Sequence, residues 1–335
     1  MPAWACRRPA YLRIVLRLPI IILLLLVNVK PFAQTIGGNT IFNFLKVPNA
    51  PQLSALGGIN VSQVSNDAGL AFNNPALLKP QMHSQMNAVF NNFYAGISSY
   101  HLSLGYYHQK LNTNFLWGLN YFNYGSTQQT DASGNVLGKF RPTDWVMQFS
   151  ASRSYLEKWN YGATLKFISS NYGPYRSNGL AVDVGVLFHD SAQLFSASIL
   201  VKNMGFQLKQ YDGTDPGDLP FDMQAGLTKR LENAPFGFSF TAHHLHLFDI
   251  SYNDTVFNNE NGFQNGGNKK FSFDKLFRHF VFATTIYLGD KVEVIAGYNH
   301  LRRKELSIGK GGNGLNGFSL GAALVLDKLQ VRYAR

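Results

Sequence analysis

The sequence predicts an all-β fold, an antiparallel transmembrane β-barrel of about 14 strands that occupies residues 84–335. Composition is the first observation behind this prediction: 15% of the residues are charged, 14% are aromatic and 31 are glycine. Soluble domains carry about 25% charged residues, so this chain is poor in charge. The second observation is a period-two alternation of apolar and polar residues that begins near residue 84 and recurs at regular spacing. A soluble all-β sandwich is the alternative fold.

The segment at residues 178–189 shows how the two faces of the predicted strands differ. Leu180 and Val182 fall on one face of this segment. Asp183 and Gly185 fall on the other. Strands in lipid need an apolar outer face and must close into a ring, because no water solvates their amides. A soluble sandwich would place charges on its outer face. The second face here is small and weakly charged, which favours the barrel.

The connections between the predicted strands alternate between short and long, as in outer-membrane barrels with tight periplasmic turns and extended outer loops. We expect strands to start near residues 84, 98, 113, 144, 159, 177, 193, 219, 235, 278, 291, 315 and 328. The long connections, expected on the outer side, are residues 125–143, 209–219, 248–277 and 302–315.

The count of thirteen segments is odd, whereas single-chain bacterial barrels have an even number of strands. We therefore expect a fourteenth strand, which either lies beyond this sequence or is hidden in the pattern. The chain ends Tyr333-Ala334-Arg335 and lacks the terminal aromatic residue that is expected of a barrel.

Residues 1–33 have the pattern of a secretory signal peptide, in which arginines precede the apolar run Leu18–Val27. We expect cleavage after Ala33. An N-terminal membrane anchor is the alternative, but the run is short for a span of about 20 residues. Removing the five basic residues of this segment lowers the net charge from +11 to +6, without a basic block that would favour nucleic acid. It also removes Cys6, the only cysteine, and with it any disulfide or cysteine metal site.

Residues 34–83 lie between this leader and the first strand, and they show neither strand alternation nor a long helical stripe. They are rich in small residues and asparagine, as in Ala55-Leu56-Gly57-Gly58 and Asn74-Pro75-Ala76-Leu77. Small residues let backbone pack closely on backbone, and asparagine side chains can satisfy buried amides that a loop leaves unpaired. The segment is therefore predicted to be a hatch inside the barrel. An ordinary surface loop is the alternative.

The motif within this segment resembles the N-terminal hatch of the FadL-like outer-membrane barrels, and more narrowly the PorQ family of the type IX secretion system. The resemblance covers Gly37–Leu78 in residues and the remainder of the chain in layout. The motif residues are Phe42, Phe44, Leu45, Pro48, Ala55, Leu56, Gly57, Gly58, Asp67, Asn74, Pro75, Ala76 and Leu77.

The resemblance implies a non-enzymatic component of type IX secretion in the outer membrane of a Gram-negative bacterium of the Bacteroidetes kind. It implies that the outer loops hold a PorZ-like surface protein beside a PorU-like sortase and a PorV-like barrel. The remaining contacts would be with lipid and lipopolysaccharide, without a cofactor. The alternative is a FadL-like channel for hydrophobic or small solutes, since a fold does not by itself settle function.

Three charged residues, Lys166, Asp183 and Glu293, fall on the inward faces of predicted strands. Ionisable groups at membrane depth usually point into the lumen. We expect these three side chains to face the lumen and to form ion pairs with each other or with the hatch. A role in lining a conduit is the alternative.

The sequence assigns no catalytic residue and no metal ligand. On a continuous strand His244 and His246 share the outward face while His243 points away, and no carboxylate is placed to complete a metal site. The sequence also contains no nucleophile elbow, no phosphate loop opening a helix and no supported pair of catalytic carboxylates. An enzymatic function therefore has no support.

Overall fold

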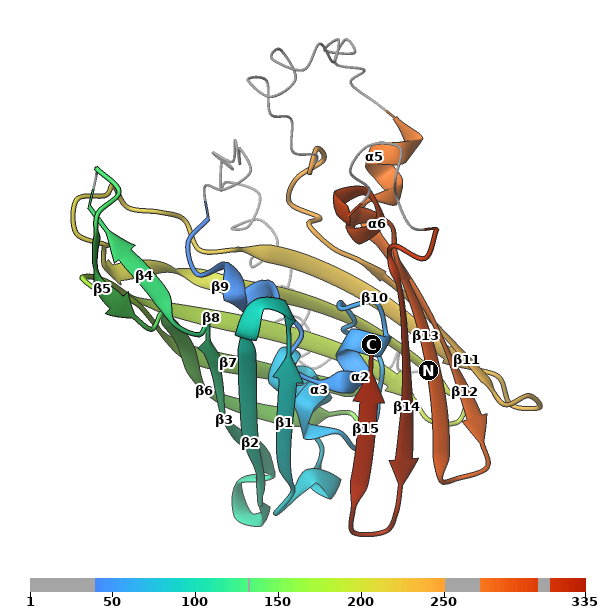
Figure 1. Ribbon diagram of the computed structural model, residues 1–335. Coiled ribbons are helices and arrows are strands. Elements are labelled where there is room, and N and C mark those ends of the chain that lie inside the picture. Colours follow the sequence, from blue (N-terminus) through green and yellow to red (C-terminus); the bar gives the residue numbers. More distant parts are fainter. Residues whose placement is uncertain (1–39, 132, 251–271, 307–313) are drawn as a thin grey trace, which may run out of the picture. The chain divides into compact units, whose positions relative to one another are not determined.

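The computed structural model of the chain describes residues 40–131, 133–250, 272–306 and 314–335 (Figure 1). The predicted signal peptide lies outside the described residues, as do most of the long connection at residues 248–277 and the start of the glycine-rich run at residues 309–314. None of the helices within the described ranges has the length and apolar character needed to cross a membrane.

A single antiparallel sheet of thirteen strands forms the body of the protein, and each strand pairs with its neighbours in chain order. The strands are β1 (Met86–Asn92), β2 (Ser98–His108), β3 (Thr113–Asn123), β6 (Thr143–Tyr155), β7 (Trp159–Tyr172), β8 (Tyr175–Asp190), β9 (Phe195–Lys209), β10 (Asp222–Arg230), β11 (Phe236–Ala242), β12 (Phe280–Leu288), β13 (Val292–Asn299), β14 (Phe318–Val325) and β15 (Gln330–Ala334). Each start lies within three residues of the predicted one, so the thirteen predicted strands are confirmed.

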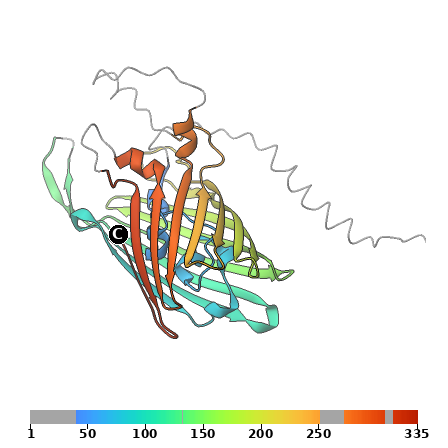
Figure 2. The same ribbon diagram turned by 90° about the vertical axis from the view of Figure 1, so that its right-hand side faces the viewer.

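The sheet has two edges, β1 and β15, which form no ladder with each other. No fourteenth strand joins the sheet within the described residues, so the alternative of a strand hidden in the pattern is not met there. The strands curve about a segment of the chain that runs along their inner side (Figures 1 and 2).

The two faces of the sheet differ as the alternation predicts, with large apolar side chains exposed and polar side chains buried. In β7, Leu165 is 57% exposed whereas its neighbours Thr164 and Lys166 are 1% and 5% exposed. In β8, Asp183 is fully buried between half-buried Val182 and exposed Val184. The polar face is therefore the inner face of this sheet.

The N-terminal segment, residues 40–85, covers the inner face of the sheet with short helical turns, and no strand or long helix interrupts it, as predicted. Its helical elements are η1 (Asn43–Lys46), α2 (Pro51–Ala55), α3 (Ala68–Asn73), η2 (Pro75–Leu77) and η3 (Pro80–Met82). The largest apolar core lies between this segment and the sheet: Leu70, Phe72 and Leu77 pack against residues such as Leu116 and Ile168. The core thus joins elements distant in sequence.

Glycine on the inner face lets the N-terminal segment approach the strands closely. A Cβ atom on Gly297 of β13 would lie 2.5 Å from the carbonyl oxygen of Ala55. A Cβ atom on Gly162 of β7 would lie 2.7 Å from the carbonyl carbon of Pro75. Both neighbours are backbone atoms that cannot move aside as a flexible side chain would, so the small inner residues follow from the packing.

The long connection at residues 125–143 is more ordered than the sequence predicts. It forms a two-stranded hairpin of β4 (Thr127–Thr130) and β5 (Val136–Phe140) that extends past the ends of the neighbouring strands (Figure 1). The turn is stabilised by Asp131, whose carboxylate accepts hydrogen bonds from the backbone N–H groups of Ser133 and Asn135. Such Asx turns compete well with open loop conformations.

Within the described ranges, four further helical elements connect strands. They are η4 (Tyr94–Gly96), η5 (Gln109–Leu111), α5 (Phe273–Phe277) and α6 (His300–Leu306). The last two occupy the connections predicted as long outer loops. Asp274 of α5 forms ion pairs with Arg278, His300 and Lys304, which ties α5 to α6.

We predict that Gly297→Ala destabilises the protein by about 1–3 kcal/mol, the usual cost of overpacking, because the new methyl group meets the backbone of residues 55–57. Gly138→Ala in β5 is the control, since a Cβ atom there meets nothing within 4 Å. Urea unfolding followed by tryptophan fluorescence measures both variants. Equal midpoints for the two would contradict the close packing of the N-terminal segment on β13.

Candidate functional site

The residues of the predicted hatch motif all lie in the N-terminal segment, and all are buried except Leu45 and Pro48, which are half-buried. Gly57 and Gly58 have φ angles of 89° and 87°, a left-handed backbone that favours glycine. This turn brings the chain against β13 and β14: Asn299 donates a hydrogen bond to the Gly57 carbonyl at 3.0 Å. The conformation explains the Gly-Gly pair of the motif.

Asn74 satisfies polar groups on both sides of its own turn. Its amide nitrogen donates to the carbonyl of Val61 at 2.8 Å and lies 3.0 Å from the hydroxyl of Ser198 in β9. Its amide oxygen accepts from the backbone N–H of Ala76 at 3.0 Å. The side chain therefore links the N-terminal segment to the inner face of the sheet, as the sequence predicts for buried asparagine.

Asp67 contacts both edges of the sheet. Its carboxylate caps α3 by accepting from the N–H of Gly69, and it accepts a second hydrogen bond from Asn87 of β1 at 2.8 Å. Its other oxygen lies 3.4 Å from Nε of Arg332 in β15, and Arg332 also donates to Glu293 at 2.9 Å. Burial raises the pKa of Asp67, and the attraction of Arg332 opposes that shift.

The predicted inward charges divide into two ion pairs. Lys166 and Asp183 lie 2.5 Å apart on β7 and β8, with Lys166 also donating to Asn203 at 2.9 Å. The pair sits at a register shift where two residues of β9 face Asp183, whose carboxylate accepts the N–H of Asn203. Glu293 pairs with Arg332 instead, a partner that the sequence analysis did not identify.

A small cavity remains between the N-terminal segment and the sheet. Its volume of about 30 Å³ suffices for one or two waters. The lining is mixed, and its polar members include Asn73, Asn120, Gln148, Lys166 and Lys202. Lys202 also donates a hydrogen bond to Asn73, so a lysine of β9 reaches the N-terminal segment. The space is too small and too polar for a lipid chain.

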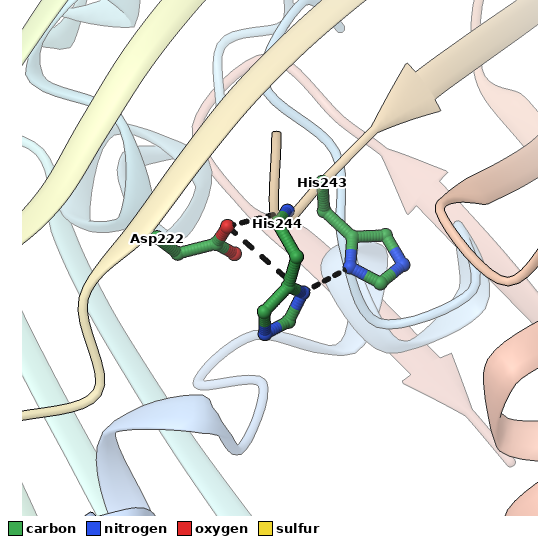
Figure 3. A group of neighbouring side chains, drawn as sticks. All are labelled: Asp222, His243 and His244. Atoms are coloured by element: carbon green, nitrogen blue, oxygen red, sulfur yellow. Dashed lines mark hydrogen bonds and ion pairs between the residues drawn. The ribbon is translucent and has the colours of Figure 1, made fainter. Parts of the chain in front are cut away.

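A second polar cluster lies where β10 begins and β11 ends, and it consists of Asp222, His243 and His244 (Figure 3). One ligand atom from each residue lies within 4.8 Å of the others. The ring nitrogens Nδ1 of His243 and His244 are 2.5 Å apart, and Asp222 accepts the backbone N–H of His244 at 2.6 Å. These donors match those of a divalent transition-metal site.

The prediction that His243 and His244 point to opposite faces is wrong. β11 ends at Ala242, and His244 has a φ angle of 54°, so the strand alternation no longer applies. The left-handed turn swings the His244 ring back beside His243. Asp222, which the sequence analysis did not consider, comes from the neighbouring strand. The sequence offers only its position, at the start of β10, the strand before the one that ends at the histidines.

Burial dominates the electrostatics of this cluster. Burial first, and the neighbouring His244 ring second, lower the pKa of His243 to about 3. Burial also lowers the pKa of His244, while the carboxylate of Asp222 opposes that shift. Both imidazoles are therefore neutral near pH 7, which is the form in which histidine binds a metal.

Comparison with protein-family models finds no match, and comparison with curated proteins finds none either. The resemblance to the PorQ family therefore stays a prediction that rests on the motif residues, and the hatch and signal peptide stay predictions with it.

We predict that Lys166→Met and Asp183→Asn each lower the free energy of unfolding by about 3–5 kcal/mol. The first substitution leaves the buried carboxylate of Asp183 without its cation, and the second leaves the buried ammonium group of Lys166 without its anion. The double variant should lose less than the sum of the two. Lys158→Met is the control: Lys158 pairs with Asp190 at 2.7 Å but is 53% exposed, so its loss should cost no more than about 1 kcal/mol. If the double variant lost the sum of the two single losses in urea unfolding, the predicted coupling between Lys166 and Asp183 would be contradicted.

Proposed function

We propose that this protein is an outer-membrane β-barrel of the FadL-like type, plugged by its N-terminal segment as a hatch, and a non-enzymatic component of type IX secretion. One observation carries the membrane part of the proposal: the sheet is apolar outside and polar inside. Leu165, Phe149 and Phe238 are each half exposed or more, and an exposed apolar belt of this extent would be unstable in water. Lipid is the environment in which it is favourable.

The contacts of the N-terminal segment support its role as a hatch. The segment contributes much of the core, its asparagines bond to the strands, and Asp67 reaches Asn87 and Arg332 on the two sheet edges. A surface loop would not be buried so completely. The wall of the proposed barrel is the thirteen-stranded sheet, and the hatch joins its edges.

The filled interior favours a scaffold over a channel. A transporter for hydrophobic solutes needs an apolar pocket, whereas the inner cavity is about 30 Å³ and is bordered by two lysines. The inner face also holds the buried pair of Lys166 and Asp183, which an apolar solute would have to pass. The alternative of a FadL-like channel therefore has no specific observation in its favour.

The outer rim offers ordered surfaces for the proposed docking of partners. The hairpin β4–β5 projects beyond the sheet with Val136 and Leu137 exposed. The ion pairs of Asp274 hold α5 and α6 together at the same end of the sheet. By the PorQ resemblance, these surfaces hold a PorZ-like surface protein beside a PorU-like sortase and a PorV-like barrel.

We predict that Leu165→Arg prevents stable insertion, because a charge on the lipid-facing side near the bilayer midplane costs about 2–4 kcal/mol. Leu137→Arg is the matched control: Leu137 is 64% exposed but lies in the projecting hairpin. Outer-membrane fractionation and heat-modifiable gel mobility measure insertion. In water both substitutions would be harmless, so an unaffected Leu165→Arg variant would overturn the membrane assignment.

We predict that the mature protein, extracted from its own outer membrane in mild detergent, retains a large soluble surface protein and a sortase-like protein. Affinity purification followed by mass spectrometry identifies them. A variant with residues 127–140 replaced by a short turn, which removes the hairpin without touching the sheet, tests whether that surface takes part.

Recovery of the barrel alone, with bound fatty acid or lipid, would move the function to the transporter. Loss of partners from the hairpin variant, with its heat-modifiable mobility intact, would locate the dock at the hairpin. Unchanged partner retention by that variant would instead point to the connections that contain α5 and α6.

A further inference from the structure

The cluster of Asp222, His243 and His244 has a geometry that the scaffold role does not explain. The two Nδ1 atoms lie 2.5 Å apart, closer than the about 2.9–3.0 Å of an ordinary hydrogen bond between nitrogen and oxygen. Two nitrogens bound tetrahedrally to zinc at about 2.0–2.1 Å lie about 3.3 Å apart. Opening the pair by less than about 1 Å would therefore admit an ion between them.

The backbone holds the donors in place from three neighbouring strands. Asp222 begins β10 and accepts the N–H of His244 at 2.6 Å, and the N–H of His243 donates to the carbonyl of His279 at 2.9 Å, just before β12. The N–H of Leu245 donates to the carbonyl of Met223 at 3.0 Å. The donors are thus positioned by paired strands, so little ordering is needed on binding.

We propose that Asp222, His243 and His244 bind one divalent transition-metal ion of the Zn²⁺ type at the outer rim of the sheet. Figure 3 shows the His244 ring between the Asp222 carboxylate and the His243 ring. Asp222 accepts one hydrogen bond at each oxygen, from His244 and Gln224, and each oxygen keeps a further lone pair for the ion. Three protein ligands leave a fourth position for water.

The donor set selects the ion. Two imidazole nitrogens and one carboxylate oxygen suit Zn²⁺ and similar ions, whereas Ca²⁺ and Mg²⁺ prefer sites built from oxygen. His279 acts behind the site: its ring nitrogens lie 2.8 Å and 3.1 Å from the carbonyl oxygens of His243 and Phe248. An N–H of this ring can donate to one of these carbonyl oxygens, so His279 supports the backbone beside the site, and we do not assign it as a ligand.

The position of the site gives the ion a structural task. Asp222 follows the connection between β9 and β10, while His243 and His244 open the long connection between β11 and β12. An ion bound to all three would fasten the bases of both connections to each other. This inference does not depend on secretion partners, because it rests on the contacts of the cluster alone.

The experiment uses the mature chain folded in detergent, stripped with a chelator and titrated with Zn²⁺ against a chromogenic chelator. We expect one tightly bound equivalent in the parent protein and at least about tenfold weaker binding in both His244→Gln and Asp222→Asn. His300→Gln is the matched control, since His300 lies on the same side of the sheet but pairs with Asp274. It should bind Zn²⁺ as the parent does.

A second measurement keeps the result independent of folding defects. Heat-modifiable gel mobility confirms that each variant is folded, and Zn²⁺ should raise the thermal midpoint of the parent and of His300→Gln but not of His244→Gln. The proposal is overturned if the parent binds no zinc, if the ligand variants bind it as tightly as the parent, or if His300→Gln loses it equally. Partner pull-down is a separate readout, so failure here leaves the scaffold proposal standing.

Discussion

The carboxylate of Asp67 is the point on which the arrangement of this protein depends, because it touches both ends of a sheet that does not close through its own strands. One oxygen bonds to Asn87 at the first edge, and the other faces Arg332 at the last edge. These edges are the first and last of the thirteen strands, so the contact spans the whole strand order of the sheet.

Contacts between the N-terminal segment and the strands continue along the inner face of the sheet. A curved sheet with a polar interior leaves hydroxyl and amide groups without water, and each such group needs a partner. The N-terminal segment supplies many of them: Gln148 donates to the carbonyl of Phe72, and Ser196 donates to the carbonyl of Ser62. Where strand and segment come too close for a side chain, glycine takes the position. The abundance of small and polar residues on the inner face therefore follows from the close packing of the N-terminal segment against the strands.

The end of the sheet that carries the hairpin β4–β5, α5 and α6 is ordered in a different way. There the strands end, and order comes from local polar contacts such as the Asp131 turn, the ion pairs of Asp274 and the histidine cluster. These contacts order this end of the sheet, as the proposed scaffold function would require of a surface that binds partners. The proposed metal site would add a further constraint at the bases of two connections.

The sequence by itself determined the thirteen strands, their inward and outward faces and the lack of strands and long helices in the N-terminal segment, because period-two alternation is a local property of the chain. It also placed Lys166 and Asp183 inward. Only the tertiary structure decided their partners. Arg332 contacts Asp67, although 265 positions separate the two residues in the sequence. Asp222 at the start of β10 contacts His244, which lies in the turn that follows the end of β11. Register and a single left-handed residue set those contacts, and neither leaves a local signature in the sequence.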